Sequence, residues 1–95
     1  MRLLLPTRMK IKESLQVEVR SRQGLIYEGE LEAVTSYNTV GPFDVLPRHS
    51  NFISMINKKL ILRQHDGRTD EITLDNGVMM VEENKVYIFL GIAKV

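Results

Sequence analysis

Residues 60–74 read LILRQHDGRTDEITL, and this stretch decides the fold class. Two runs that alternate in polarity, Leu60–Gln64 and Thr69–Leu74, flank the dipeptide Asp66-Gly67. An Asp-Gly pair between such runs predicts a β-hairpin with a type I′ turn, because both central residues need positive φ. A second pair of apolar runs, Val78–Val81 and Val86–Leu90, follows across residues 82–84 and predicts a second hairpin.

The same pattern extends towards the N-terminus. Leu15, Val17 and Val19 alternate with polar residues, which is typical of a half-buried strand. Residues 21–24 predict a turn, and residues 25–37 a further strand. After a loop over residues 38–42, residues 43–45 resume the pattern briefly. Residues 52–56 form another apolar run, which residues 60–62 continue after the exposed pair Lys58-Lys59. Helical periodicity is weak throughout, so the sequence predicts an all-β sandwich or barrel.

Length and charge indicate one small domain. The chain has 95 residues, of which 43% are hydrophobic, and its net charge is +1. Four of the cations and one acidic residue lie in the first 14 positions: Arg2, Arg8, Lys10, Lys12 and Glu13. We therefore expect residues 1–14 to be a disordered basic tail and residues 15–95 to form the folded domain. Residues 1 to about 8 should show no protection from amide hydrogen exchange or be absent from the native protein.

Catalytic and metal-binding patterns are not found. Because there is no cysteine, disulfides and thiolate metal sites are excluded. His49 and His65 have no neighbours at metal-ligand spacing, and no glycine-rich phosphate loop is present. Glu28, Glu30 and Glu32 share one strand face, where a solvent-facing role is favoured over acid–base chemistry or a cation site. We expect no enzyme, no cofactor, no small-molecule substrate and no nucleic-acid partner.

Four segments resemble the N-terminal β-sandwich domain of the ATP synthase epsilon subunit. Residues 26–34 (IYEGELEAV) are similar to the family's segment leading into Glu-x-Val, and residues 44–53 (DVLPRHSNFI) to its Gly-Ile-Leu-Pro-Gly-His-Ala-Pro-Leu-Leu motif. Residues 75–81 (DNGVMMV) resemble Ser-Gly-Gly-Phe-x-x-Val, and residues 84–90 (NKVYIFL) the closing strand. The resemblance covers nearly all of residues 15–95. Arg48 replaces the family's glycine before His49, and Pro42 lies where an acidic residue is usual.

The resemblance implies a two-sheet β-sandwich of about ten strands. It also implies a non-catalytic subunit of the central stalk of a rotary proton-translocating ATP synthase, linking the gamma subunit to the c-ring. Such a subunit is cytoplasmic and peripheral on the inner face of the cell membrane. The chain ends at Val95, before the family's C-terminal helical hairpin, so we expect neither the ATP binding nor the inhibition carried by that hairpin. The alternative is a stand-alone β-sandwich interaction module outside ATP synthase.

Five residues are predicted to contact the partners. Tyr37, Val40 and Pro42 place apolar groups on a loop, and Arg48 and His49 follow on a Pro-led turn. For His49, a structural role in capping the turn is weighed slightly ahead of partner contact, and Arg48 could simply keep the surface soluble. Phe43 and Phe52 are expected in the core. Gly77 is expected to be required by the backbone, either because its φ is positive or because another part of the chain approaches it closely.

Overall fold

The computed structural model describes residues 13–91, so the sequence predictions for residues 1–12 lie outside the described part. All regular structure in that part is β-strand. The strands are β1 (Leu15–Ser21), β2 (Gly24–Leu31), β3 (Ala33–Tyr37), β4 (Pro42–Val45), β5 (Phe52–Arg63), β6 (Thr69–Glu82) and β7 (Lys85–Leu90). The expected all-β class is confirmed.

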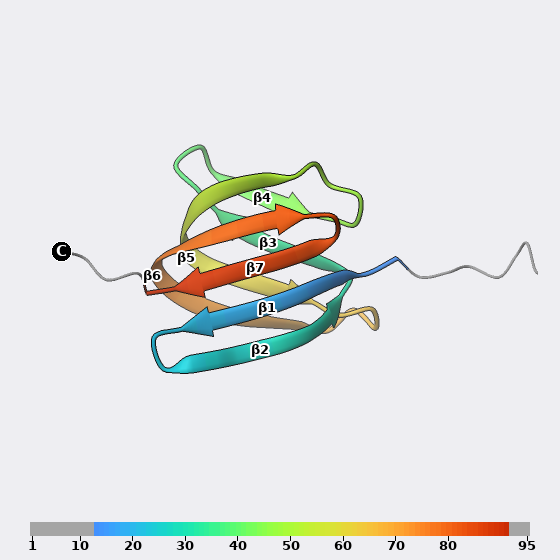
Figure 1. Ribbon diagram of the computed structural model, residues 1–95, viewed down its shortest axis with the longest axis horizontal. Helices are drawn as coiled ribbons and strands as arrows, with labels where there is room; N and C mark the ends of the chain where they lie inside the picture. The colour runs from blue at the N-terminus through green and yellow to red at the C-terminus, as the bar shows by residue number, and fades with distance from the viewer. Residues whose placement is uncertain (1–12, 92–95) are drawn as a thin grey trace, which may run out of the picture.

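The seven strands form one sheet in the order β2-β1-β7-β6-β5-β3-β4, and this sheet folds over into two layers (Figure 1). The first layer contains β2, β1, β7, residues 77–82 of β6 and residues 52–56 of β5. The second contains residues 69–74 of β6, residues 58–63 of β5, β3 and β4. Fewer strands than the expected ten are found among residues 13–91, because β5 and β6 bend and run through both layers.

The bend has a local cause in each long strand. On β5 the register with β6 shifts between Ile56 and Lys58, and Lys58 adopts a positive φ of 69°. Opposite, Gly77 is the partner of both Ile56 and Leu90. A Cβ atom at Gly77 would lie only 2.7 Å from the carbonyl oxygen of Phe89. Of the two reasons expected for a glycine here, the close approach of the neighbouring backbone therefore applies. A bulge opposite a glycine increases local twist, which folds the sheet over.

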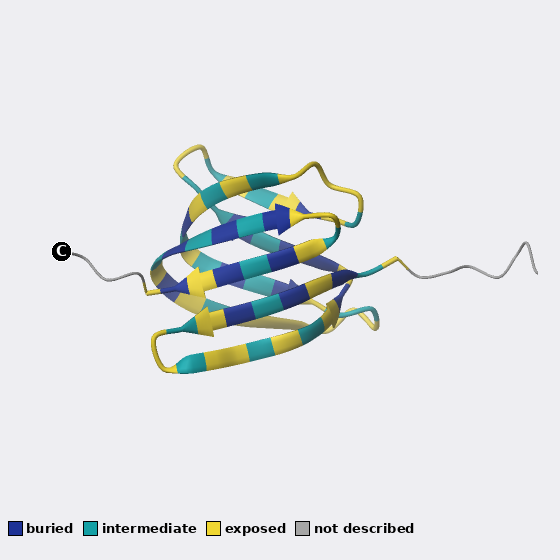
Figure 2. Cartoon of the chain, in the orientation of Figure 1, coloured by how far each residue is buried: buried dark blue, intermediate teal, exposed yellow. Residues whose placement is uncertain are grey.

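The core lies between the two layers. Burial alternates along each strand, as the bands of Figure 2 show. One apolar cluster joins residues of both layers, and its fully buried members include Leu15, Val19, Leu31, Val34, Leu60, Leu62, Met79 and Ile88. Phe43 and Phe52 are partly buried and pack against this cluster with an edge-to-face ring contact at 5.8 Å, which confirms their expected place.

The single strand expected over residues 25–37 is two strands. β2 pairs with β1 in the first layer, whereas β3 pairs with β4 and β5 in the second. Glu32 is the crossing point, and its amide N–H donates to the carbonyl of Arg63 at 2.9 Å. Glu28 and Glu30 are exposed on the outer side of the first layer, as expected.

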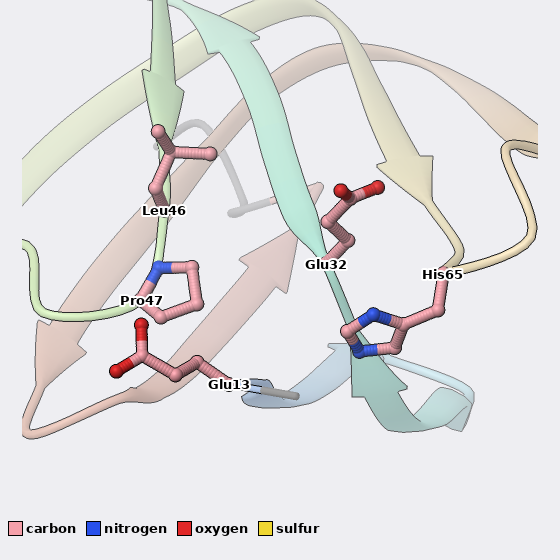
Figure 3. A pocket seen from close by; sticks show the side chains of 5 residues that line it. All are labelled: Glu13, Glu32, Leu46, Pro47 and His65. Atoms are coloured by element: carbon pink, nitrogen blue, oxygen red, sulfur yellow. The ribbon is translucent and has the colours of Figure 1, made fainter. Parts of the chain in front are cut away.

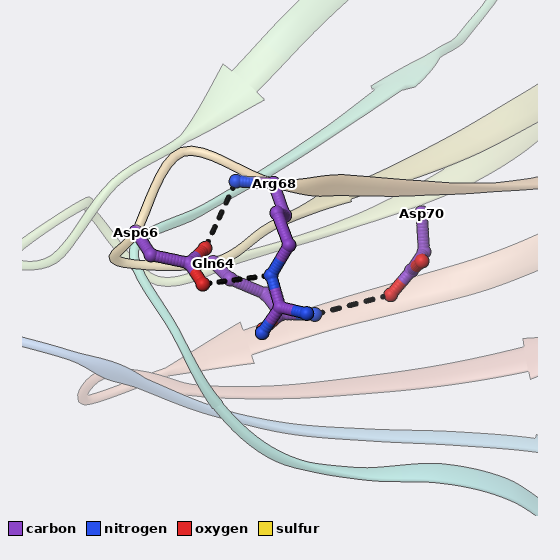
Figure 4. Close-up of polar contacts among 4 residues, drawn as sticks. All are labelled: Gln64, Asp66, Arg68 and Asp70. Atoms are coloured by element: carbon purple, nitrogen blue, oxygen red, sulfur yellow. Dashed lines mark hydrogen bonds and ion pairs between the residues drawn. The ribbon is translucent and has the colours of Figure 1, made fainter.

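The turn at Asp66-Gly67 differs in type from the expectation. At Asp66-Gly67 only Gly67 has positive φ, at 91°, so the type I′ prediction is wrong. The amide of Gly67 donates to the carbonyl of Gln64 and that of Gln64 to Arg68, which is a three-residue loop ending in a glycine bulge. Asp66 accepts from the amide and the guanidinium of Arg68 (Figure 4). The β6–β7 turn is the type I′ turn, with φ of 49° at Glu83 and 66° at Asn84.

Candidate functional site

The five residues predicted to contact partners lie at two separate places. Val40 is in the β3–β4 loop, between Tyr37 at the end of β3 and Pro42 at the start of β4. Arg48 and His49 belong to the β4–β5 loop. Tyr37 pairs with Pro42 at one end of the β3–β4 hairpin, and Val34 pairs with Val45 at the other. Three residues of strand separate these pairs by roughly 10 Å. The two loops therefore point away from opposite ends of β4 (Figure 1).

The β3–β4 loop holds Val40 outward on a rigid frame. The side-chain oxygen of Asn38 accepts from the amides of Val40 and Gly41, at 2.9 and 3.2 Å. The backbones of Asn38 and Gly41 also exchange hydrogen bonds in both directions. Val40 is 94% exposed at the tip. Because the loop is already ordered, a partner that covers Val40 would have little loop entropy to remove.

Tyr37 and Pro42 flank this tip. Tyr37 is half-buried, with the ammonium of Lys58 5.5 Å from its ring centre, and Pro42 is exposed. The structure thus brings these two residues and Val40 together on one surface, which we call the β3–β4 loop surface.

Hydrogen bonds tie the β4–β5 loop to the β6–β7 turn. The amide of Arg48 donates to the side-chain oxygen of Asn84 at 2.6 Å, and the amide of Glu83 donates to that of Asn51 at 3.0 Å. Arg48 has a positive φ of 72°, at the position where the resembling family carries glycine. Its guanidinium reaches the carboxylate of Glu13 at 2.5 Å while staying largely exposed. These contacts fix the backbone and leave the cation facing solvent.

His49 has structural contacts of its own. Its ring Nδ1 lies 2.8 Å from the carbonyl oxygen of Ser50, and its ring packs 4.9 Å from that of Phe52. Its amide donates to the carbonyl of Leu46 and closes the turn. These contacts support the role of capping the turn, which was slightly favoured for His49. The residue as a whole remains exposed. Arg48 and His49 form the β4–β5 loop surface.

A hollow of about 480 Å³ lies beside the β4–β5 loop surface (Figure 3). It is lined by Glu13, Glu32, Leu46, Pro47 and His65. His65 is half-buried, and its Nε2 lies 2.9 Å from the hydroxyl oxygen of Ser14. A serine nucleophile needs a base that is itself oriented by a third group, and no carboxylate is bonded to the other ring nitrogen of His65 among the described residues. The pair is therefore a structural contact.

Other chemistry is equally limited in the described residues. No group of three or more His, Asp or Glu side chains between residues 13 and 91 is placed to hold a metal ion. Nor does that part of the chain contain a helix with the length and apolarity needed to cross a membrane.

The outer side of the first layer also exposes large apolar residues, which the sequence analysis did not select. Ile53 is 70% exposed, Met55 60% and Phe89 48%. The signal was present in the sequence, because residues 52–56, 78–81 and 86–90 are nearly continuous apolar runs. Such runs are typical of strands that are covered on both faces.

Comparisons with known proteins agree with the fold. Residues 14–94 match the family described as ATP synthase, delta/epsilon chain, β-sandwich domain. ATP synthase epsilon chains of Nitratiruptor sp. and Campylobacter fetus are 31% and 27% identical over 74 and 78 residues, or 77% and 81% of this chain. The chain spans 57% and 60% of the length of these two relatives.

Solved structures show the same architecture. A chain of the Euglena gracilis mitochondrial ATP synthase superimposes with a TM-score of 0.77 at 18% identity, covering 85% of this chain and 52% of its own length. A chain of the Tetrahymena thermophila enzyme, from a structure of the central stalk and c-ring, gives 0.67 at 12%, covering 85% and 66%. Taken with the family match over residues 14–94, the two-layer sheet and the motifs around His49 and Gly77 show that the chain belongs to the β-sandwich domain family of ATP synthase delta and epsilon chains.

Proposed function

We propose that this chain is a non-catalytic subunit of the central stalk of a rotary proton-translocating ATP synthase, where it links the gamma subunit to the c-ring. It works through contacts alone, with no cofactor and no small-molecule substrate, and catalysis resides on other chains. Its place is the cytoplasmic side of the cell membrane, as part of the complex. Membership of the family supports this role.

The observation that carries the proposal is the separation of the two loop surfaces. A subunit that links two partners needs two docking surfaces that do not overlap. The β3–β4 loop surface and the β4–β5 loop surface lie at opposite ends of β4, and hydrogen bonds hold each of them in place. We assign the β3–β4 loop surface to the c-ring and the β4–β5 loop surface to the gamma subunit.

Two single substitutions test this assignment. Val40→Asp should weaken binding to the c-ring and leave binding to the gamma subunit unchanged, whereas Arg48→Glu should do the reverse. Loss of one interface anchor costs about 1–3 kcal/mol, roughly a 5- to 150-fold loss of affinity. Binding is measured against the purified gamma subunit and c-ring of the same organism.

Matched controls separate binding from folding. Val40→Thr keeps the shape of the side chain without a charge, and Arg63→Glu reverses an exposed charge on the second layer. Melting temperatures should hardly change, because exposed substitutions cost under about 0.5 kcal/mol. A wild-type chain that binds neither partner at micromolar concentration would favour the stand-alone interaction module. If either variant weakened both contacts equally, the assignment of the two surfaces would be wrong.

A further inference from the structure

β2 lies at one end of the sheet and pairs on one side only (Figure 1). β1 is its neighbour, and no other strand among residues 13–91 pairs with it. A strand with a single neighbour leaves alternate backbone N–H and C=O groups facing outward, where a further strand can add. The extra residue Ile26 interrupts the register with β1, so the straight part of this edge runs from Tyr27 to Leu31.

The strand at the other end of the sheet is protected against such pairing, and β2 is not. β4 has four residues and begins with Pro42, which has no N–H to donate. β2 has neither proline nor lysine along its eight residues. Its charged residues are Glu28 and Glu30, and both are exposed. The edge of β2 is therefore open to a strand that supplies the opposite charge.

The two carboxylates of β2 lie on the outer side of the first layer. In the pairing with β1, Glu28 is directly opposite Glu18, and like charges in such positions are unfavourable. Glu30 is opposite Gln16, whose amide donates to it at 3.0 Å. Glu18 has Arg20 as its ion-pair partner. None of the ion pairs formed within residues 13–91 includes Glu28 or Glu30, so cations on an added strand would meet both carboxylates.

The inner side of the same edge is apolar. The side chain of Tyr27 packs against the core cluster, and its hydroxyl oxygen would lie 2.8 Å from a Cβ atom at Gly29. A hollow of about 430 Å³ lies between β2 and β6, and its lining includes polar residues of the β1–β2 turn and of β6. Its apolar lining consists of Ile26, Ile72, Leu74 and Leu90. A strand with cations on one side and apolar residues on the other therefore fits both sides of this edge.

The strands of this chain do not supply such a segment. Within residues 13–91 the one-sided stretches are β2, β4, residues 52–56 of β5 and residues 69–74 of β6, and any charged residues on them are acidic. The cations on strands lie where the strand has neighbours on both sides: Arg20, Lys58, Lys59, Arg63 and Lys85. Pairing of β2 with β2 of a second copy would bring carboxylates together. Charge complementarity thus favours a segment of a different protein.

We propose that the edge of β2 binds an extended basic segment of a partner protein, which adds to the sheet as a further strand. Two lysine or arginine residues at alternate positions of the segment lie opposite Glu28 and Glu30. The residue between them packs on the ring of Tyr27, and a second apolar residue reaches the hollow beside Ile26. The edge shares no residue with either loop surface, and this proposal holds or fails independently of the ATP synthase function proposed above.

Three eight-residue peptides test backbone pairing and charge separately. In the first, lysine alternates with valine. In the second, glutamate replaces each lysine. In the third, every backbone nitrogen of the lysine peptide is methylated, so the charges remain but the peptide cannot pair as a strand. The isotope-labelled 95-residue chain is titrated with each peptide and followed by amide hydrogen exchange. We expect the lysine peptide to protect alternate amides within residues 27–31 and to leave the buried Ser36 of the second layer unchanged.

The lysine peptide should bind at least tenfold more tightly than the methylated peptide, because several backbone hydrogen bonds are lost. Combining Glu28→Gln with Glu30→Gln should weaken its binding about fivefold. The matched control, Glu71→Gln with Glu83→Gln, removes two exposed carboxylates elsewhere and should leave binding unchanged. Equal binding of the lysine peptide and either of the other two, or no protection of β2 amides at millimolar lysine peptide, would overturn the proposal. A dimer seen by sedimentation and lost on neutralising Glu28 and Glu30 would instead assign the edge to residues 8–12 (RMKIK) of a second copy.

Discussion

Substitution of Gly77 by alanine should destabilise the domain, because the sheet bends around this residue. Gly77 is buried in β6 and is paired on both sides, with Ile56 of β5 and Leu90 of β7. An alanine Cβ would lie 2.7 Å from the carbonyl oxygen of Phe89. It would also lie 3.3 Å from side-chain carbons of Ile56 and Leu90. The carbonyl belongs to a paired strand, so it cannot move away without breaking the ladder.

Two opposing terms determine the size of the effect. Overpacking a filled core costs about 1–3 kcal/mol. Replacing glycine by alanine also restricts the unfolded chain and returns about 0.4–1 kcal/mol. Gly77→Ala should therefore lower the free energy of unfolding by about 1–2 kcal/mol. For a domain of this size, that is a fall in Tm of roughly 4–15 °C.

Gly29→Ala is the matched control, since neither glycine has positive φ and the unfolded-state gain is the same. At Gly29 the nearest atom to a new Cβ is the hydroxyl oxygen of Tyr27, at 2.8 Å, at the tip of a side chain that can rotate. Urea unfolding should show Gly29→Ala close to the wild type and Gly77→Ala clearly weaker. Equal midpoints for the two variants would refute the argument from backbone contact.

Three further changes test other parts of the structure. Arg48→Gly should raise the free energy of unfolding by about 0.5–1 kcal/mol in a denaturant titration, because the left-handed φ of Arg48 costs about 1–2 kcal/mol and glycine's extra entropy offsets part of this gain. Ser36→Ala should cost about 1 kcal/mol by the same measurement, since the fully buried Ser36 hydroxyl donates to the carbonyl of Lys59 at 2.9 Å. The amide of Arg68, and then its guanidinium, lower the pKa of Asp66. The stability this gives is present above the ordinary carboxyl pKa of about 4 and is lost as the pH falls through the lowered value. A carboxyl NMR titration should therefore show Arg68→Ala raising the pKa of Asp66 only partway, because the amide contact remains.

The fold class could be predicted because alternation of polarity is a local property. Leu15, Val17 and Val19 point into the core as expected, and both predicted hairpins are present. The bend was harder to predict. The run over residues 52–62 continues through Lys58 and Lys59 as expected, but nothing in it indicates the bulge at Lys58, which lies opposite Gly77 on another strand. Contacts between distant positions are not visible in local patterns.

The turn types depended on distant contacts for the same reason. Glu83 adopts positive φ although Asp-Gly would suit that turn better. Its amide donates to the side chain of Asn51, and the next residue, Asn84, accepts from Arg48. The β4–β5 loop therefore holds a turn more than 30 residues away in a conformation that the dipeptide itself does not specify.

The site residues illustrate how topology rearranges neighbours in sequence. Tyr37 and His49 are close along the chain and were both predicted to contact the partners. The intervening strand β4 instead carries the chain from one end of the sandwich to the other. Candidate residues that are neighbours in sequence therefore lie on two separate surfaces.

The outer side of the first layer shows what alternation alone overlooks. A sheet with one buried side needs apolar residues at every second position only, and β1 meets that need with Gln16, Glu18 and Arg20 on its outer side. Its neighbours β5, β6 and β7 place Met55, Val78 and Phe89 at matching outer positions. This excess adds nothing to the core between the layers. Leaving it in water forgoes a burial free energy of about 25 cal/mol per Å² of apolar surface. Apolar residues on both sides of the same three strands are typical of a sheet that is covered on both faces.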